Sequence, residues 1–234
     1  YTSIFLVYLC NMATILNLET STKNCSVSIA KDGVQLCLVE ESDENYAHGE
    51  KLNQFVDWCV EGAQINWKDI EAVCVSKGPG SYTGLRIGVS SAKGFAYGSD
   101  IPLMAINSLQ ILAESQLNQE VDYIIPMIDA RRMEVYTALF DKQGNQLTET
   151  EAKVIDETSF EELKGKKIIF VGDGAEKCQE VLAHLDATFI QTFPSAKDMI
   201  RVAEEKFNQK SFEDVAYFEP YYLKDFVAGK KKSE

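Results

Sequence analysis

The chain has 234 residues, with 36 acidic and 23 basic side chains and a formal net charge of −13. This length can hold one large domain or two small lobes, and either buries enough apolar surface to form a core. The acidic excess disfavours tight binding of a nucleic-acid backbone by this chain alone.

The first eleven residues, YTSIFLVYLCN, are apolar but resemble neither a signal peptide nor a membrane span. They lack a basic segment and a small-residue cleavage site, and they are too short to cross a bilayer. Because Met12 precedes a strand-like segment, residues 1–11 are interpreted as an extension from an upstream start. The six cysteines are scattered without a CxxC pair, which is typical of free thiols in a reducing compartment. We therefore expect a cytoplasmic protein without membrane association.

The first half of the chain alternates predicted strands and helices. Apolar and polar residues alternate on both sides of the turn at Asp32 and Gly33, which predicts a hairpin. Later apolar residues recur at spacings of three and four, which predicts a helix. In chain order, we expect strands over 14–20, 25–31 and 34–41, a helix over 47–62, a strand over 70–77, a helix over 83–98, a strand over 102–107 and a helix from 108.

The pattern restarts near residue 122. Strands are expected over 122–130, 133–141 and from 168, and the first two overlay the opening strands at an offset of about 110 residues. Glu19 and Asp129 fall at the same place in this overlay, near the end of the first strand of each half. The sequence therefore predicts an α/β fold of two similar lobes, over 12–118 and 119–234, with a helical C-terminal tail. A ligand cleft is expected where the two first strands end.

Residues 76–84, SKGPGSYTG, form a glycine-rich turn that enters a helix. A Walker loop requires a lysine that this turn lacks, and the third glycine comes one place too late for GxGxxG. The turn therefore indicates only a generic anion site. Hydroxyl groups and glycines at the expected cleft give six weak nucleotide candidates: Thr20, Ser21, Gly78, Gly80, Gly172 and Gly174.

The helix after this turn carries small residues at every fourth position, namely Gly84, Gly88, Ala92 and Ala96. Glycine inside a helix costs about 1 kcal/mol relative to alanine, so close approach of another backbone is expected to offset the penalty. The approaching element is either the protein's own sheet or a helix of another subunit. We favour another subunit, with the sheet kept as the alternative.

Catalytic motifs are absent from the sequence. There are only two histidines, His48 and His184, and no HExxH or GxSxG pattern. Neither a histidine metal site nor an activated serine is therefore indicated.

Five segments in this order resemble the TsaB (YeaZ) family: ILNLETSTKNCSVSI, KGPGSYTGLRIGVSSAKGFA, PMIDARRMEVYTALF, VGDGA and EPYYLKDFVAGKK. The resemblance covers about residues 12–230. It implies an actin-like ATPase fold, which is a duplicated ribonuclease H-like fold. It also implies a role in the bacterial synthesis of threonylcarbamoyladenosine in tRNA.

The same resemblance implies a non-catalytic scaffold or dimerisation subunit that supports a catalytic paralogue, TsaD. That paralogue carries metal-binding histidines where this chain has Asn107, Ser108 and Leu112, so we expect no metal site. A TsaE-type ATPase as a further partner and indirect contact with tRNA are also implied. Separately, the hydroxyls of Thr20 and Ser21 and the glycine turns at Gly78 and Gly172 lead to the hypothesis that ATP or ADP binds weakly at the complex interface.

Partner contact is expected on the helices over 47–62 and 83–98, with TsaD or, without it, with a second copy of this chain. The interface candidates are His48, Leu52, Phe55, Gly84, Gly88, Ala92 and Ala96. The alternative function is an independent phosphotransferase or glycoprotease-like peptidase that uses the interlobe cleft.

Overall fold

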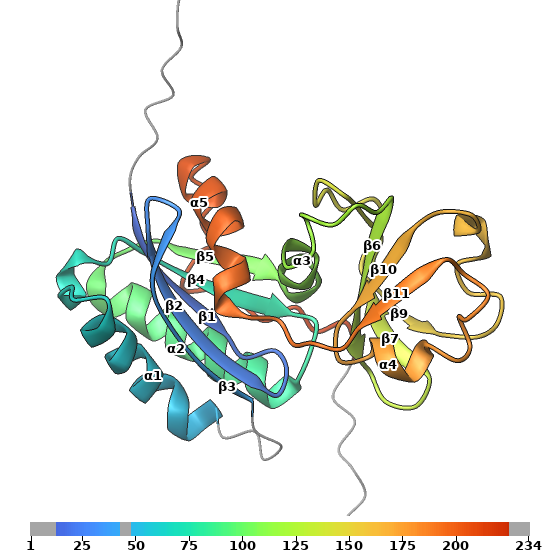
Figure 1. Cartoon of the computed structure of the whole chain (residues 1–234). Helices are drawn as coiled ribbons and strands as arrows, with labels where there is room; N and C mark the ends of the chain where they lie inside the picture. The colour runs from blue at the N-terminus through green and yellow to red at the C-terminus, as the bar shows by residue number, and fades with distance from the viewer. Residues whose placement is uncertain (1–12, 43–47, 225–234) are drawn as a thin grey trace, which may run out of the picture.

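The computed structural model describes residues 13–42 and 48–224, which form two lobes that lie side by side (Figure 1). Each lobe is built on one mixed β-sheet. The expectation for residues 1–11 lies outside the described residues.

The first sheet has the strand order β3-β2-β1-β4-β5. β1 pairs antiparallel with β2 and parallel with β4, and every residue of β1 is buried. The strands are β1 (Thr14–Glu19), β2 (Asn24–Lys31), β3 (Val34–Ser42), β4 (Ala72–Gly78) and β5 (Leu103–Asn107). The hairpin predicted at Asp32 and Gly33 joins β2 to β3, with both residues at positive φ.

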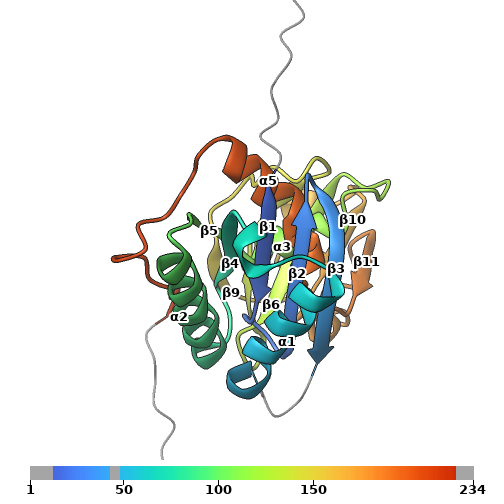
Figure 2. The ribbon, with the colours of Figure 1, turned by 90° about the vertical axis from the view of Figure 1, so that its left-hand side faces the viewer.

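Helices cover both faces of this sheet (Figure 2). Leu16 and Leu18 of β1 pack with α1 (His48–Gly62) and α2 (Tyr82–Ser99) on one face. Ile15 packs on the opposite face with residues of α3 (Ser108–Glu114) and α5 (Ile200–Asn208). Because successive strand residues point to opposite faces, β1 contributes apolar side chains to both cores. Asn17 is the polar residue at its centre, and its side chain donates to the Ser28 hydroxyl at 3.2 Å.

The second sheet repeats the arrangement, with the order β11-β10-β6-β7-β9. β6 is central, antiparallel to β7 and parallel to β10, just as β1 is antiparallel to β2 and parallel to β4. The elements are β6 (Tyr123–Asp129), β7 (Glu134–Thr137), β8 (Phe140–Asp141), β9 (Glu151–Val154), β10 (Ile168–Val171), α4 (Ala175–Cys178) and β11 (Ala187–Ile190), with single 3-10 turns at Trp67–Asp69, Glu161–Leu163 and Ala196–Met199. The predicted duplication is thus present in the strand pairing.

The C-terminal part of the chain returns to the first lobe, which corrects the expected assignment of all residues after 118 to the second lobe. Met199 and Ala203 pack against the first sheet, and Val215 and Phe218 lie against its other core. Residues 209–224 contain no helix, so the expected helical tail is not found in this described part. α5 packs on the first sheet because the face of that sheet opposite α1 and α2 is apolar and must be covered.

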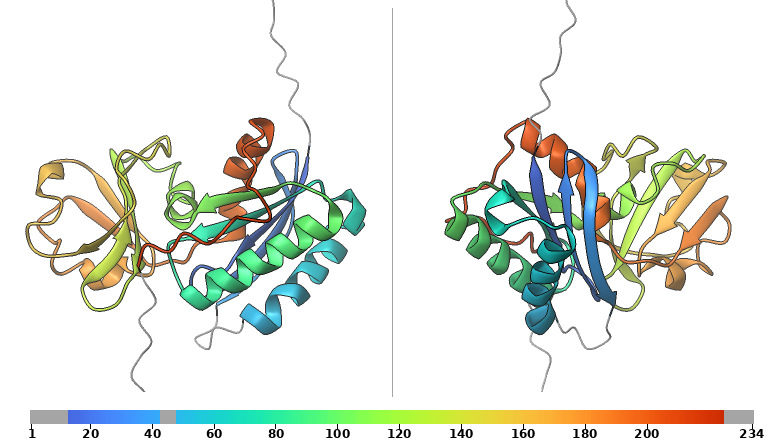
Figure 3. Two further views of the ribbon diagram at one scale, coloured as in Figure 1. Left: turned by 180° about the vertical axis from the view of Figure 1, so that it is seen from behind. Right: turned by 60° about the vertical axis from the view of Figure 1, so that its left-hand side comes forward.

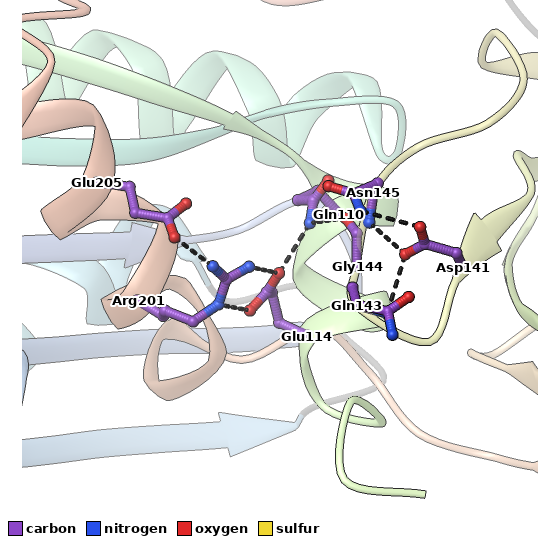
Figure 4. A network of polar contacts seen from close by, with 8 residues as sticks. All are labelled: Gln110, Glu114, Asp141, Gln143, Gly144, Asn145, Arg201 and Glu205. Atoms are coloured by element: carbon purple, nitrogen blue, oxygen red, sulfur yellow. Dashed lines mark hydrogen bonds and ion pairs between the residues drawn. The ribbon is translucent and has the colours of Figure 1, made fainter. Parts of the chain in front are cut away.

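A polar network joins α5, α3 and the turn of the second lobe after β8 (Figure 4). Arg201 of α5 donates from Nε to Glu114 Oε2 at 2.7 Å, and a second bond runs from its Nη2 to Oε1. Gln110 donates to Glu114 Oε1 at 2.8 Å and to the Gly144 carbonyl at 3.0 Å. The network therefore fixes α3 between the two lobes.

Among the described residues, no helix is both long and apolar enough to cross a membrane.

Candidate functional site

A cavity of about 770 Å³ lies between the lobes. Its walls are the turn after β1, the glycine turn before α2, the loop after β6 and the C-terminal residues 221–224. Asp129 at the end of β6 lines it, as expected from the overlay of the two halves. This is the cleft that the sequence predicted at the ends of the two first strands.

The turn after β1 and the glycine turn touch each other at backbone level. Ser81 N donates to the Ser21 carbonyl at 2.6 Å, and a Cβ on Gly80 would lie 2.2 Å from the same oxygen. Ser81 also caps α2, because its side chain accepts from Gly84 N at 3.3 Å. Position 80 must therefore be glycine, because a side chain there would strike the Ser21 carbonyl.

The six nucleotide candidates are not gathered at one surface. Ser21 and Gly80 line the cavity, whereas the hydroxyl of Thr20 is buried and donates to the Gly84 carbonyl at 2.8 Å. A Cβ on Gly78 would meet the Tyr221 carbonyl at 2.8 Å.

The glycine turn after β10 serves packing in the same way. A Cβ on Gly172 would lie 2.2 Å from the Met127 carbonyl, and Gly174 N donates to that carbonyl at 2.9 Å. Gly172 and Gly174 therefore let the turn lie directly against β6.

Glu19 ends β1 but lies behind the cavity wall, fully buried. Ser21 N donates to its Oε1, while its buried Oε2 has no hydrogen-bond partner. Burial raises the pKa of Glu19 from 4.5 to about 7, against the opposing effect of the hydrogen bonds from Ser21. This carboxyl group is placed to hold the turn and does not reach a ligand in the cavity.

The second-lobe wall carries two neighbouring carboxylates. Asp129 N donates to Asp173 Oδ1 at 2.9 Å, and Asp129 is ion-paired with Lys177. Burial, together with the charge of Asp129, raises the pKa of Asp173 to about 6. Because Arg131 and Lys224 also line the cavity, its walls carry both signs of charge.

The structure corrects the expected interface residues. A Cβ on Gly84 would lie 2.1 Å from the Thr20 carbonyl, and one on Gly88 would lie 2.2 Å from the Thr20 hydroxyl. Ala92 and Ala96 are 0% and 1% exposed. The small residues at every fourth position therefore seat α2 on its own sheet, which was the alternative interpretation.

The three expected interface residues of α1 also point inward. His48, Leu52 and Phe55 are buried, and Leu52 and Phe55 belong to the core beneath α1 and α2. His48 Nε2 donates to the Thr22 carbonyl at 2.7 Å. These side chains cannot contact another subunit unless α1 moves.

A different face of α2 is open to solvent. Nothing lies within 4 Å of a Cβ built on Gly94 or Gly98. Together with Asn53, Asp57 and Trp67, these glycines line a groove of about 360 Å³ between α1 and α2. Sequence reasoning missed this face, although Gly94 and Gly98 are also four residues apart.

The two histidines lie in different lobes. The His48 ring is held inside the first lobe, and His184 is exposed in the second lobe. Within residues 13–42 and 48–224, no cluster of three or more His, Cys, Asp and Glu side chains is placed to hold a metal.

Known proteins match this chain over most of its length. Residues 42–232 match the family model of TsaD, tRNA N6-adenosine threonylcarbamoyltransferase. The chain is 29% identical to the tRNA threonylcarbamoyladenosine biosynthesis protein TsaB of Escherichia coli (strain K12), over 93% of this chain and 97% of that protein. It is 28% identical to the protein of the same name from Bacillus subtilis (strain 168), over 90% of this chain and 94% of that protein.

Among solved structures, YeaZ from Pseudomonas aeruginosa superposes with a TM-score of 0.78 at 23% identity, over 91% of this chain and 100% of that chain. This likeness and the repeated strand order confirm the actin-like fold with two mixed α/β lobes. The matched residues 42–232 include most of both lobes. The chain therefore belongs to the TsaB (YeaZ) family of tRNA threonylcarbamoyladenosine biosynthesis proteins.

Proposed function

We propose that this protein is a scaffold subunit that binds a TsaD-type catalytic paralogue in the cytoplasm and supports transfer of a threonylcarbamoyl group to tRNA adenosine. The groove between α1 and α2 is the observation that carries the proposal. Its two exposed glycines let a facing helix approach the backbone of α2 closely, and Trp67 and Phe95 supply apolar walls.

The surroundings of the groove favour a protein partner. Tyr97, on α2 between the two groove glycines Gly94 and Gly98 in the sequence, is 83% exposed. Aromatic residues are enriched at protein interfaces, where they contribute large contact areas. The net charge of −13 also suits a subunit that leaves most contact with tRNA to its partners.

The experiment is a measurement of the dissociation constant between this chain and a TsaD-type protein. Gly94→Leu places a side chain in the groove, and nothing lies within 4 Å of a Cβ at this position, so we expect the fold to be kept while affinity falls about tenfold or more. Gln179→Leu, which adds the same side chain at an exposed position of the second lobe, is the control. Equal affinity of both variants and the unmodified chain would place the interface elsewhere.

Nucleotide binding at the complex interface remains part of the proposal, with Ser21 and Gly80 as the two candidates that line the cavity. A second copy of this chain and a TsaE-type ATPase are further proposed partners. Calorimetry with ATP and ADP, on the chain alone and with its TsaD-type partner, tests the first point. If neither titration gives a heat of binding, the proposal that nucleotide binds is contradicted.

The rival function is an independent phosphotransferase or peptidase in the interlobe cavity. Asp129 is the carboxylate such an enzyme would use, but its Oδ1 accepts from Arg131 N at 2.9 Å and is ion-paired with Lys177. Hydrolysis of ATP or of a glycoprotein by the purified chain, abolished by Asp129→Ala, would establish the rival and contradict the scaffold role.

A further inference from the structure

The last described segment of the chain, residues 213–224, is a strap that runs from the first lobe to the second (Figure 3). It is anchored firmly on the first lobe. Glu213 N donates to the Leu103 carbonyl at 2.8 Å, and Lys93 Nζ on α2 donates to the Phe218 carbonyl at 2.9 Å. Val215 and Phe218 pack against the core beneath α1 and α2. These contacts fix the strap along the first lobe.

The strap then crosses the glycine turn. Tyr221 N donates to the Lys77 carbonyl at 2.7 Å, and the Tyr221 carbonyl covers Gly78. The ring of Tyr222 lies 4.8 Å from that of Tyr82 at the start of α2, and Arg86 Nε donates to the Tyr222 hydroxyl at 3.3 Å. The strap thus covers the beginning of the helix.

On the second lobe the strap is held by an ion pair between Lys224 and Glu134 of β7. The two side chains are 43% and 22% exposed. Ion pairs that are exposed to solvent contribute little stabilisation. The first-lobe end of the strap is instead held by backbone hydrogen bonds and buried apolar contacts. Lys224 can therefore separate from Glu134 while residues 213–218 keep their contacts with the first lobe.

We propose that residues 221–224 form a latch that joins the two lobes along one side of the interlobe cavity in the isolated chain, and that it opens to admit an occupant. All four residues line the cavity, as do Ser21 and Gly80. Any molecule that reaches Ser21 and Gly80 from the side of the strap must displace Tyr222 and break the pair between Lys224 and Glu134. The latch is independent of the interface groove, which lies between α1 and α2.

Hydrogen exchange of the full chain, read by mass spectrometry, tests the latch. Tyr221 N donates to the Lys77 carbonyl at 2.7 Å, and Tyr222 N donates to the Pro220 carbonyl at 3.1 Å. The protection of these two amides therefore reports whether the strap lies on the glycine turn. Glu134→Gln removes the charge that holds Lys224, and Tyr222→Ala removes the ring. Glu151→Gln is the control, because Glu151 pairs with Lys153 elsewhere in the second lobe.

We expect the amides of residues 221–224 to exchange up to about fivefold faster in Glu134→Gln and up to about tenfold faster in Tyr222→Ala. Glu151→Gln should match the unmodified chain. Circular dichroism should show that all variants are folded. If Tyr222→Ala and Glu134→Gln exchange as slowly as the control, or if residues 221–224 of the unmodified chain exchange at the rate of an unstructured peptide, the latch does not exist.

Discussion

Thr20 and Gly88 touch across the junction of sheet and helix, with the Thr20 hydroxyl 2.2 Å from the place where a Cβ of Gly88 would lie. The same hydroxyl donates to the Gly84 carbonyl of α2. The turn after β1 is thus pressed against the backbone of α2, and residue 88 has no room for a side chain.

Gly88→Ala should therefore lower the free energy of unfolding by about 1–2 kcal/mol, since the cost of overpacking exceeds the helix propensity gained. Gly94→Ala is the matched control on the same helix. Nothing lies near a Cβ there, so it should raise the free energy of unfolding by up to about 1 kcal/mol. Urea denaturation of the three proteins measures both values. A stabilising Gly88→Ala would contradict the contact.

A double-mutant cycle isolates the contact between the two residues. Thr20→Ala removes the hydroxyl that an alanine at position 88 would strike, although it also removes the bond to Gly84. Gly88→Ala should then cost less in the Thr20→Ala background than in the unmodified chain. Additive effects would show that the helix relaxes by some other movement.

The buried carboxyl group of Glu19 should make stability depend on pH. Its folded pKa of about 7 exceeds the ordinary value of 4.5. The stabilisation is therefore complete below pH 4.5 and lost as the pH rises through 7, by about 3 kcal/mol in all. Glu19→Gln removes this term. Unfolding free energies at several pH values should show the unmodified chain losing stability relative to the variant between pH 5 and pH 8, and a difference that is constant with pH would refute the assignment.

Arg201→Ala should destabilise the junction of α3 and α5. The Glu114 side chain is only 4% exposed, so the variant leaves a buried carboxylate without its cation. We expect a loss of about 2 kcal/mol in the free energy of unfolding, less than for a fully buried pair because Arg201 is half-exposed. Adding Glu114→Gln should recover part of the loss. If Arg201→Ala lowers the free energy of unfolding equally with and without Glu114→Gln, the loss does not come from the ion pair between Arg201 and Glu114.

The fold was largely predictable because its pattern is local and repeated. The turn at Asp32 and Gly33, the period of apolar residues in α1 and the restart near residue 122 each identified an element. The strand expected over 133–141 is split into β7 and β8. The return of α5 to the first sheet was missed, because a single helical pattern does not reveal which of two sheets its apolar face covers.

The candidate site was predictable in position but not in detail. The overlay of Glu19 with Asp129 located the end of each first strand correctly, yet Glu19 is buried and Asp129 lines the cavity. Spacing identified the small residues of α2 without showing which of its two small faces, that of Gly88 or that of Gly94, meets the sheet. That choice depends on the turn at Thr20, which is distant in sequence and close only after folding.

The most direct test of the scaffold role is threonylcarbamoyl transfer to tRNA by a TsaD-type protein, measured with and without this chain. The reaction is supplied with threonylcarbamoyl adenylate and tRNA. We predict transfer only when both proteins are present, reduced transfer with Gly94→Leu at limiting concentration, and no transfer by this chain alone. Equal transfer in the absence of this chain, or transfer by this chain without its partner, would contradict the account.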